Sequence, residues 1–345
     1  MEERKKQVLN AIIKDYIANA EPVGSRAVSK KYDLGVSPAT IRNEMSDLEE
    51  EGYIEQPHTS AGRIPSAKGY RYYVDNMMQR EPLTSAQRHQ VREIMSGEFS
   101  ELDSFMRSCC NMISRLTNYT SIAAVPEQGR GNLLNLQLVS INEYQVLVIL
   151  LASTGIVRHK LFELPLPINA EELARIEQKL RQYLVGAELK NISYDMLRER
   201  LYDFQRQDKL AEQAFDLLEQ TLTGETAHKI FTGGIMNMLS QPEFQDIEKL
   251  RSMMSIIEDD PQVEKLLQTS DSDQLTVTIG GEMPVEGAQD CSMVVANYFV
   301  NGEKAGSLGV LGPTRLNYSR TVSLMEFIAG ELSRTMSDKD KKSQE

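Results

Sequence analysis

The chain of 345 residues has no tryptophan, three cysteines and no apolar run near the roughly 18 residues that a membrane-spanning helix needs. Cys109 and Cys110 are adjacent and Cys291 is remote, a pattern that gives neither a disulfide framework nor a set of four metal ligands. We therefore expect buried thiols in a reducing cytosol. The chain start shows no apolar segment of a signal peptide, so a cytoplasmic location is expected. Metal-ligand spacing is also missing from the four histidines, His58, His89, His159 and His228.

Catalytic motifs are absent as well. The sequence contains no GxSxG, HExxH, phosphate-loop GK[ST] or CxxC. Gly280-Gly281 and the segment from Gly306 to Gly312 are rich in glycine, but they lie between predicted strands and open no helix, as a phosphate-binding loop must. We expect a binding protein that needs no cofactor and no metal, and not an enzyme.

The net charge of −12 would normally argue against a nucleic-acid partner. The acidic surplus is uneven, because residues 241–290 hold 12 acidic and 3 basic side chains. Residues 1–80 hold 12 of each, and the stretch 56–74 has no carboxylate. A neutral part with a basic edge suffices for DNA binding if a dimer doubles the contacts to phosphate.

The segment 37–52 predicts a short helix with a polar outer face. Ser37 suits the N-cap and Pro38 the first helical position, and Gly52 closes the helix. An apolar stripe then faces inward, made by Ile41, Met45 and Leu48. The opposite face carries side chains that can pair with base edges in the major groove. These are Ala39, Asn43 and Ser46, with Thr40 and Arg42 at the flanks.

The surrounding sequence predicts a winged helix-turn-helix. A helix over 4–19 is followed by a break at 21–24, a second helix from Ser25 to Tyr32, and a tight turn containing Gly35. After the third helix, a hairpin with its tip at Pro57 to Gly62 forms the wing. The predicted DNA contacts are Ser37, Ala39, Thr40, Arg42, Asn43, Ser46, His58, Thr59, Ser60, Arg63, Lys68 and Arg71.

Four motifs resemble those of the HrcA family of heat-inducible transcription repressors. The segment 56–66, QPHTSAGRIPS, runs into 69–75, GYRYYVD, and the helix 37–45, SPATIRNEM, precedes them. Near the other end stand 279–282, IGGE, and 309–318, GVLGPTRLNY, in which Leu316 replaces an expected Met of similar volume. The resemblance covers essentially the whole chain. It implies a bacterial repressor that binds double-stranded DNA at an inverted repeat upstream of chaperone operons, as a homodimer, under control of the GroE chaperonin.

The rest of the chain is predicted to be α+β, with strands from 122 to 164, a mostly helical stretch to about 240, and strands again from 275 to 311. This pattern suggests one domain inserted in another, and the resemblance implies a GAF-like domain split by a dimerisation domain. We assign residues 1–80 to the DNA-binding domain, 81–164 and 241–338 to the GAF-like domain, 165–240 to the insert and 339–345 to a disordered tail. Apolar side chains at helical spacing predict the dimer contacts, which are Leu180, Tyr183, Leu184, Leu197, Leu201, Phe215 and Leu218.

Three alternatives stay open at this point. The helical surface of the insert could pack on the parent sheet and not on a second copy. The GAF-like domain could hold a small-molecule effector, although its inward strand positions are mainly Val, Leu and Ile, which favours a repressor coupled to a chaperone. Intrinsic thermosensing rivals control by the chaperonin, because a discontinuous domain needs many non-local contacts and the 16 methionines give adaptable packing.

Overall fold

A computed structural model describes residues 1–59, 61–97, 102–126, 132–152, 157–164, 167–187, 228–268 and 274–344. The chain forms two compact units. The first unit joins Met1–Val125 to Ile230–Glu345, and the second, here called the insert, is Pro126–Lys229. The chain is α+β, as predicted, and the insert interrupts the first unit in sequence.

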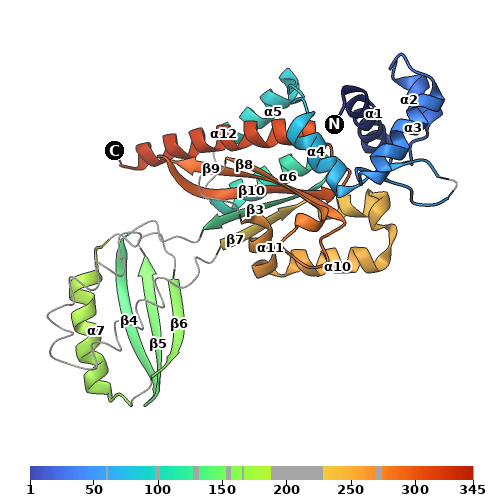
Figure 1. The fold of residues 1–345 in the computed structure, drawn as a ribbon. Coiled ribbons are helices and arrows are strands. Elements are labelled where there is room, and N and C mark those ends of the chain that lie inside the picture. Colours follow the sequence, from blue (N-terminus) through green and yellow to red (C-terminus); the bar gives the residue numbers. More distant parts are fainter. Residues whose placement is uncertain are drawn as a thin grey trace. The chain divides into compact units, whose positions relative to one another are not determined.

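The first unit begins with three helices and a short antiparallel hairpin, here called the head together with the helix that follows (Figure 1). Its elements are α1 (Glu3–Asn19), α2 (Ser25–Lys31), α3 (Pro38–Glu50), β1 (Ile54–Glu55), β2 (Ile64–Pro65) and α4 (Ala67–Asn76). The order matches the sequence prediction. Ser37 caps α3 by accepting a hydrogen bond from Thr40 N at 3.1 Å, and the apolar stripe is buried.

The remainder of the first unit, here called the core domain, contains a five-stranded sheet in the order β7-β3-β10-β9-β8. The strands are β3 (Thr120–Pro126), β7 (His228–Gly233), β8 (Leu275–Ile279), β9 (Cys291–Val300) and β10 (Glu303–Pro313). The helices are α5 (Ser85–Ser96), α6 (Leu102–Thr117), α10 (Ile247–Glu258), α11 (Asp260–Leu267) and α12 (Tyr318–Gln344), with 3-10 turns η2 (Ile235–Ser240), η3 (Pro242–Gln245) and η4 (Gly280–Glu282). Because α12 reaches Gln344, the prediction of a disordered tail from residue 339 is wrong.

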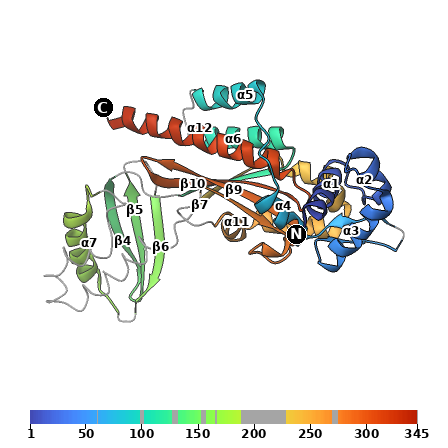
Figure 2. The same ribbon diagram turned by 45° about the horizontal axis from the view of Figure 1, so that its top comes forward.

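Helices cover both faces of the core sheet, which explains why β9 is apolar without alternation. Val294, Ala296 and Tyr298 of β9 pack in the same cluster as residues of α5, α6 and α12. Met293 and Val295 face the other way and pack with α10 and α11. Figures 1 and 2 show α12 and α5 on one side of the sheet and α11 on the other.

The described part of the insert contains a separate three-stranded antiparallel sheet, β4-β5-β6, with a helix packed on it. Its elements are β4 (Leu133–Asn142), β5 (Gln145–Ala152), β6 (Val157–Glu163) and α7 (Ala170–Leu184). The prediction that these strands continue the parent sheet and that the insert spans 165–240 is therefore wrong. A pattern of alternating side chains fixes which face of a strand is buried, but not which sheet the strand joins.

The predicted dimer contacts divide into two groups. Leu180 and Leu184 are each 1% exposed, because they pack from α7 onto the sheet of the insert, so their assignment to a dimer interface is wrong. Tyr183 is 40% exposed. The other four predicted contacts lie outside the described residues, namely Leu197, Leu201, Phe215 and Leu218.

No described helix combines the length and apolar composition required to cross a bilayer. Within the described ranges, no group of three or more His, Cys, Asp or Glu side chains is placed to hold a metal ion.

Candidate nucleic-acid interface

The N-terminal half of α3 presents the polar face that the sequence predicted. Ser37, Ala39, Arg42, Asn43 and Ser46 are all exposed. Thr40 is half-buried and its hydroxyl lies 3.0 Å from that of Ser37. A helix with short polar residues and one arginine on its leading turns suits the width of a DNA major groove.

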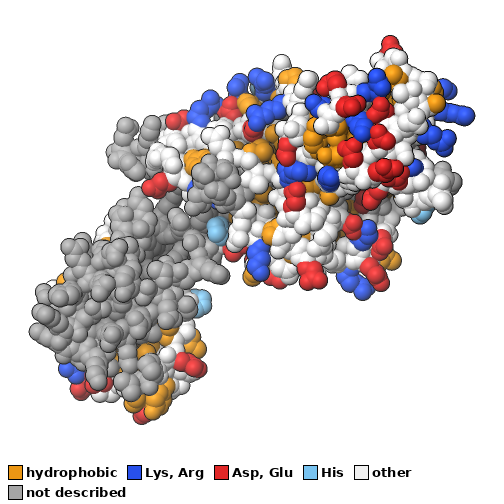
Figure 3. Space-filling view, in the orientation of Figure 1, with side chains coloured by type: hydrophobic (Ala, Val, Ile, Leu, Met, Phe, Trp, Pro, Cys, Tyr) orange, Lys and Arg blue, Asp and Glu red, His pale blue; other side chains and the backbone are white. Residues whose placement is uncertain are grey.

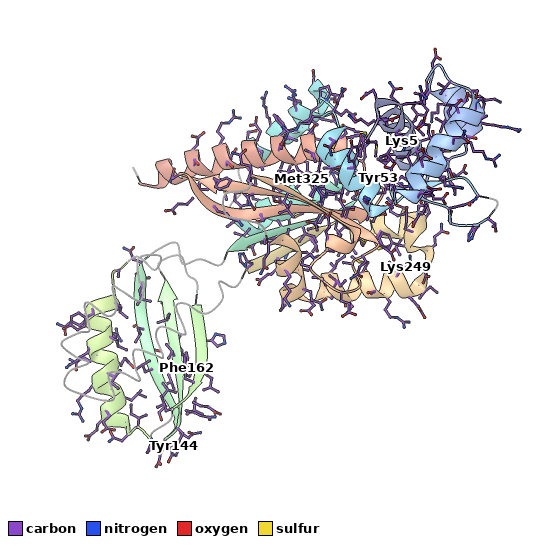
Figure 4. All side chains as sticks on the ribbon, viewed as in Figure 1. Lys5, Tyr53, Tyr144, Phe162, Lys249 and Met325 are labelled. Atoms are coloured by element: carbon purple, nitrogen blue, oxygen red, sulfur yellow. The ribbon has the colours of Figure 1, made fainter. Side chains whose placement is uncertain are left out.

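The C-terminal half of α3 is acidic, but cations from elsewhere in the head partly neutralise it. Arg4 of α1 lies 3.5 Å from Glu44. Lys5, labelled in Figure 4, pairs with Asp47 at 3.1 Å and with Glu51 at 2.8 Å. These hydrogen bonds raise the pKa of the Lys5 ammonium above its ordinary value. The repulsion that these carboxylates would exert on phosphate is therefore reduced.

Other cations of the head face solvent. Arg26 and Lys30 on α2, and Arg42 on α3, are exposed and make no ion pair with any described residue. Figure 3 shows basic side chains at the outer margin of the head. Sequence reasoning missed Arg26 and Lys30. The available signal was the composition of 25–31, SRAVSKK, which has three cations and no carboxylate.

Close contacts fix the stem of the hairpin to the connection between α1 and α2. Val23 and Arg63 exchange two backbone hydrogen bonds of 2.9 Å. Gly62 permits this approach, since a Cβ there would lie 2.5 Å from the carbonyl carbon of Val23. Gln56 braces the tip by donating from Nε2 to the carbonyl oxygens of Thr59 and Ala61, both at 3.0 Å. His58 and Thr59 are exposed at this tip, and Ser60 lies outside the described residues.

Three predicted phosphate contacts already have partners within the protein. Arg63 pairs with Glu49 at 2.7 Å. Lys68 donates to the carbonyl oxygen of Glu51 at 2.7 Å and lies 4.5 Å from the centre of the Tyr53 ring. Arg71 pairs with Glu282 of η4. Each of these cations stabilises the head or its junction with the core domain, and its contact with phosphate stays a prediction.

The junction at Arg71, here called the latch, joins α4 to the end of β8. Arg71 Nε donates to Glu282 Oε1 at 2.8 Å, and Nη2 donates to Glu282 Oε2 and to the carbonyl oxygen of Val277 at 2.6 Å. Glu282 Oε2 also accepts from the Ile279 N–H at 2.9 Å. Burial alone would raise the pKa of the Glu282 carboxyl, but hydrogen bonds from Arg71 and Ile279 hold it below its ordinary value.

Residues of two motifs that are distant in the sequence, 279–282 and 309–318, both pack against α4. Gly280 in the left-handed region, with φ of +56°, leaves room for Ala67, whose Cβ would lie 3.1 Å from a Cβ at residue 280. Tyr70 of α4 packs against Tyr318 with ring centres 5.7 Å apart. The Tyr318 hydroxyl donates to the carbonyl oxygen of Thr314 at 2.5 Å. The orientation of the head on the core domain is set by these contacts.

We expect Glu282→Gln to lower the Tm by about 3 °C at pH 7, from a loss of about 1 kcal/mol in this partly exposed pair. A carboxyl with a depressed folded pKa stabilises the fold fully above its unfolded pKa of about 4.3, and this contribution disappears as the pH falls through the folded value. In thermal scans, the difference in Tm between Glu282→Gln and the unmodified protein should therefore shrink as the pH is lowered below 5. Glu286→Gln, an exposed carboxylate in the same loop, is the control. A difference that stays constant with pH would contradict the latch.

Comparison with known proteins gives three results. The sequence profile of the HrcA protein C terminal domain matches residues 103–322. The heat-inducible transcription repressor HrcA of Pelotomaculum thermopropionicum is 42% identical over 97% of both chains, and that of Carboxydothermus hydrogenoformans is 40% identical over 99% of both. A crystal structure of a hypothetical protein at 2.2 Å resolution shares the fold, with a TM-score of 0.60, 24% identity and coverage of 98% of this chain and 99% of that one.

Proposed function

The chain belongs to the HrcA family of heat-inducible transcription repressors, and we propose that it represses transcription by binding an inverted-repeat DNA operator as a homodimer. One observation carries the proposal. The leading half of α3 exposes Arg42 and Asn43 beside the free cations of α2, while the acidic half of the same helix is partly neutralised within the head.

In this proposal the head acts as a winged helix-turn-helix, with the N-terminal half of α3 in the major groove. Asn43 pairs with adenine and Arg42 with guanine, and the Ala39 methyl contacts thymine. Arg26 and Lys30 hold phosphates on the flanking backbone, which positions the helix without reading sequence. The hairpin tip with His58 and Thr59 lies along the adjacent backbone.

We propose that the face of the insert sheet opposite α7 is the dimer surface. Register places Val139, Leu147 and Leu161 side by side across the three strands. Val139 is 39% and Leu161 52% exposed, on the face opposite the one that α7 covers. An antiparallel sheet whose second face meets water normally carries polar residues there, so an apolar row indicates a partner.

Control by the GroE chaperonin is proposed from the family resemblance. Misfolded clients would occupy the chaperonin during heat shock and leave the repressor without help in reaching its active form. The discontinuous core domain is compatible with this scheme, because β3 must pair with β10 across a separation of about 190 residues in the sequence. Operator binding measured against temperature, with and without chaperonin and ATP, separates this control from intrinsic thermosensing.

Affinities on two DNAs test the proposed interface. Asn43→Ala should cost about 1–3 kcal/mol on an operator selected from a random duplex library, and much less on unrelated DNA. Arg26→Gln should weaken binding to both DNAs and reduce the slope of log affinity against log salt by about 1 per protomer. Lys265→Gln on α11 is the matched control and should change neither the two affinities nor the salt slope. Equal losses for Asn43→Ala on both DNAs, measured by fluorescence anisotropy, would remove it from the base-reading residues.

A further inference from the structure

A cavity of about 660 Å³ lies within the first unit, where the head meets the core domain. Its walls come from α1, from the end of α4 and the residues that follow, and from the start of α12. This volume is in the range of about 300–1,000 Å³ that small-molecule sites occupy. The cavity is separate from the face of α3 that we assign to DNA.

The charged groups that line the cavity are mostly cationic. The cations are Lys14 of α1, Arg80 in the segment after α4, and Arg320 of α12. Among the described lining residues, Glu81 is the one carboxylate. Lys14 is exposed and has no ion pair among the described residues, and Arg320 has only a 3.4 Å hydrogen bond to the carbonyl oxygen of Leu116. Arg80 pairs with Glu326 at 2.6 Å. An excess of cations around a recess favours an anionic occupant.

A helix start in the cavity wall points to the same chemistry. The start of α12 adds the positive end of a long helix, where Asn317 Oδ1 accepts from the Arg320 N–H at 3.2 Å.

We propose that this cavity binds a small organic anion that carries carboxylate or phosphate groups. The anionic group lies against Lys14, Arg320 and the start of α12. Since Lys14 belongs to the head and Arg320 to the core domain, the ligand joins the two and changes the affinity of the head for DNA. Only this last coupling rests on the proposed function.

Isothermal titration calorimetry on the full chain without DNA tests the site. The probes are citrate, a hydroxylated carboxylate, and glycerol 3-phosphate, a hydroxylated phosphate, at matched ionic strength. We expect saturable binding of at least one probe, and which one binds identifies the anionic group. Lys14→Gln and Arg320→Gln should each raise the Kd at least tenfold, while Lys265→Gln leaves it unchanged.

Two results would overturn the site, namely no saturable binding of either probe, or equal Kd values in all variants. Because calorimetry needs no operator, a failure of the DNA-binding proposal leaves this test intact. In a second measurement, the bound probe should change the operator affinity of the unmodified protein and not that of Arg320→Gln. An unchanged operator affinity at saturation would overturn the coupling.

Discussion

Replacing both Val139 and Leu161 with lysine is expected to convert the proposed dimer into a monomer and to lower operator affinity by about 100-fold or more. Two ammonium groups would flank Leu147 in the middle of the apolar row, where association requires that they lose water. Both side chains are already exposed in the single chain, so the fold of the insert should survive. A monomer binds one half-site only. It therefore loses the gain in affinity that a dimer obtains when its second head binds at a high effective concentration.

Light scattering and fluorescence anisotropy measure the two effects. Ile247→Lys is the control, because Ile247 is a 71% exposed apolar residue on α10 in the core domain. This control should remain dimeric and bind the operator normally. If the double variant stays dimeric, the face of the insert sheet opposite α7 is not the dimer surface.

Gly69→Ala is expected to destabilise the head by about 3 kcal/mol, since overpacking typically costs about 1–3 kcal/mol and backbone can yield little. A Cβ at residue 69 would lie 2.1 Å from the carbonyl oxygen of Tyr53, a backbone atom at the start of the hairpin. The first turn of α4 would have to move away from β1. Thermal scanning should show an earlier transition, and operator affinity should fall because the hairpin shifts relative to α3.

The same substitution at residue 330 provides a control of opposite sign. Gly330 lies in the interior of α12, is exposed, and has no atom within 4 Å of the Cβ that alanine would add. Gly330→Ala should stabilise the protein by about 0.5–1 kcal/mol through helix propensity. Similar effects of the two substitutions would contradict the close approach of α4 to Tyr53.

Local signals were enough to predict the head. The cap at Ser37, the proline at residue 38 and the apolar stripe of α3 act within a few residues of one another, and the structure reproduces all of them. The turn chemistry of residues 57–62 likewise predicted a hairpin tip. The exposed base-reading face followed from helix geometry once the buried stripe was known.

The errors all concern partners that are distant in sequence. The strand pattern of β4–β6 revealed strands but not their separation from the core sheet, so the boundary of the insert was misplaced by about 40 residues. The stripe of α7 identified an amphipathic helix, and its own sheet, not a second chain, covers Leu180 and Leu184. The sequence did not reveal the pairing of Arg71 with Glu282, because the two lie 211 residues apart. Periodicity gives the face that is buried, and only the folded chain gives what buries it.

Site-directed DNA cleavage tests the placement of α3 most directly. Burial raises the pKa of Cys109, Cys110 and Cys291 to about 12, so a single exposed cysteine introduced into the chain is the reactive thiol at neutral pH. Ala39→Cys would carry a tethered iron chelate on the leading half of α3, and Lys265→Cys would carry it on α11 as the control. The account predicts that the Ala39 chelate cuts the operator in two clusters related by the symmetry of the inverted repeat, while the Lys265 chelate cuts at background level. Cleavage from Ala39 that is no stronger than cleavage from Lys265 would contradict it.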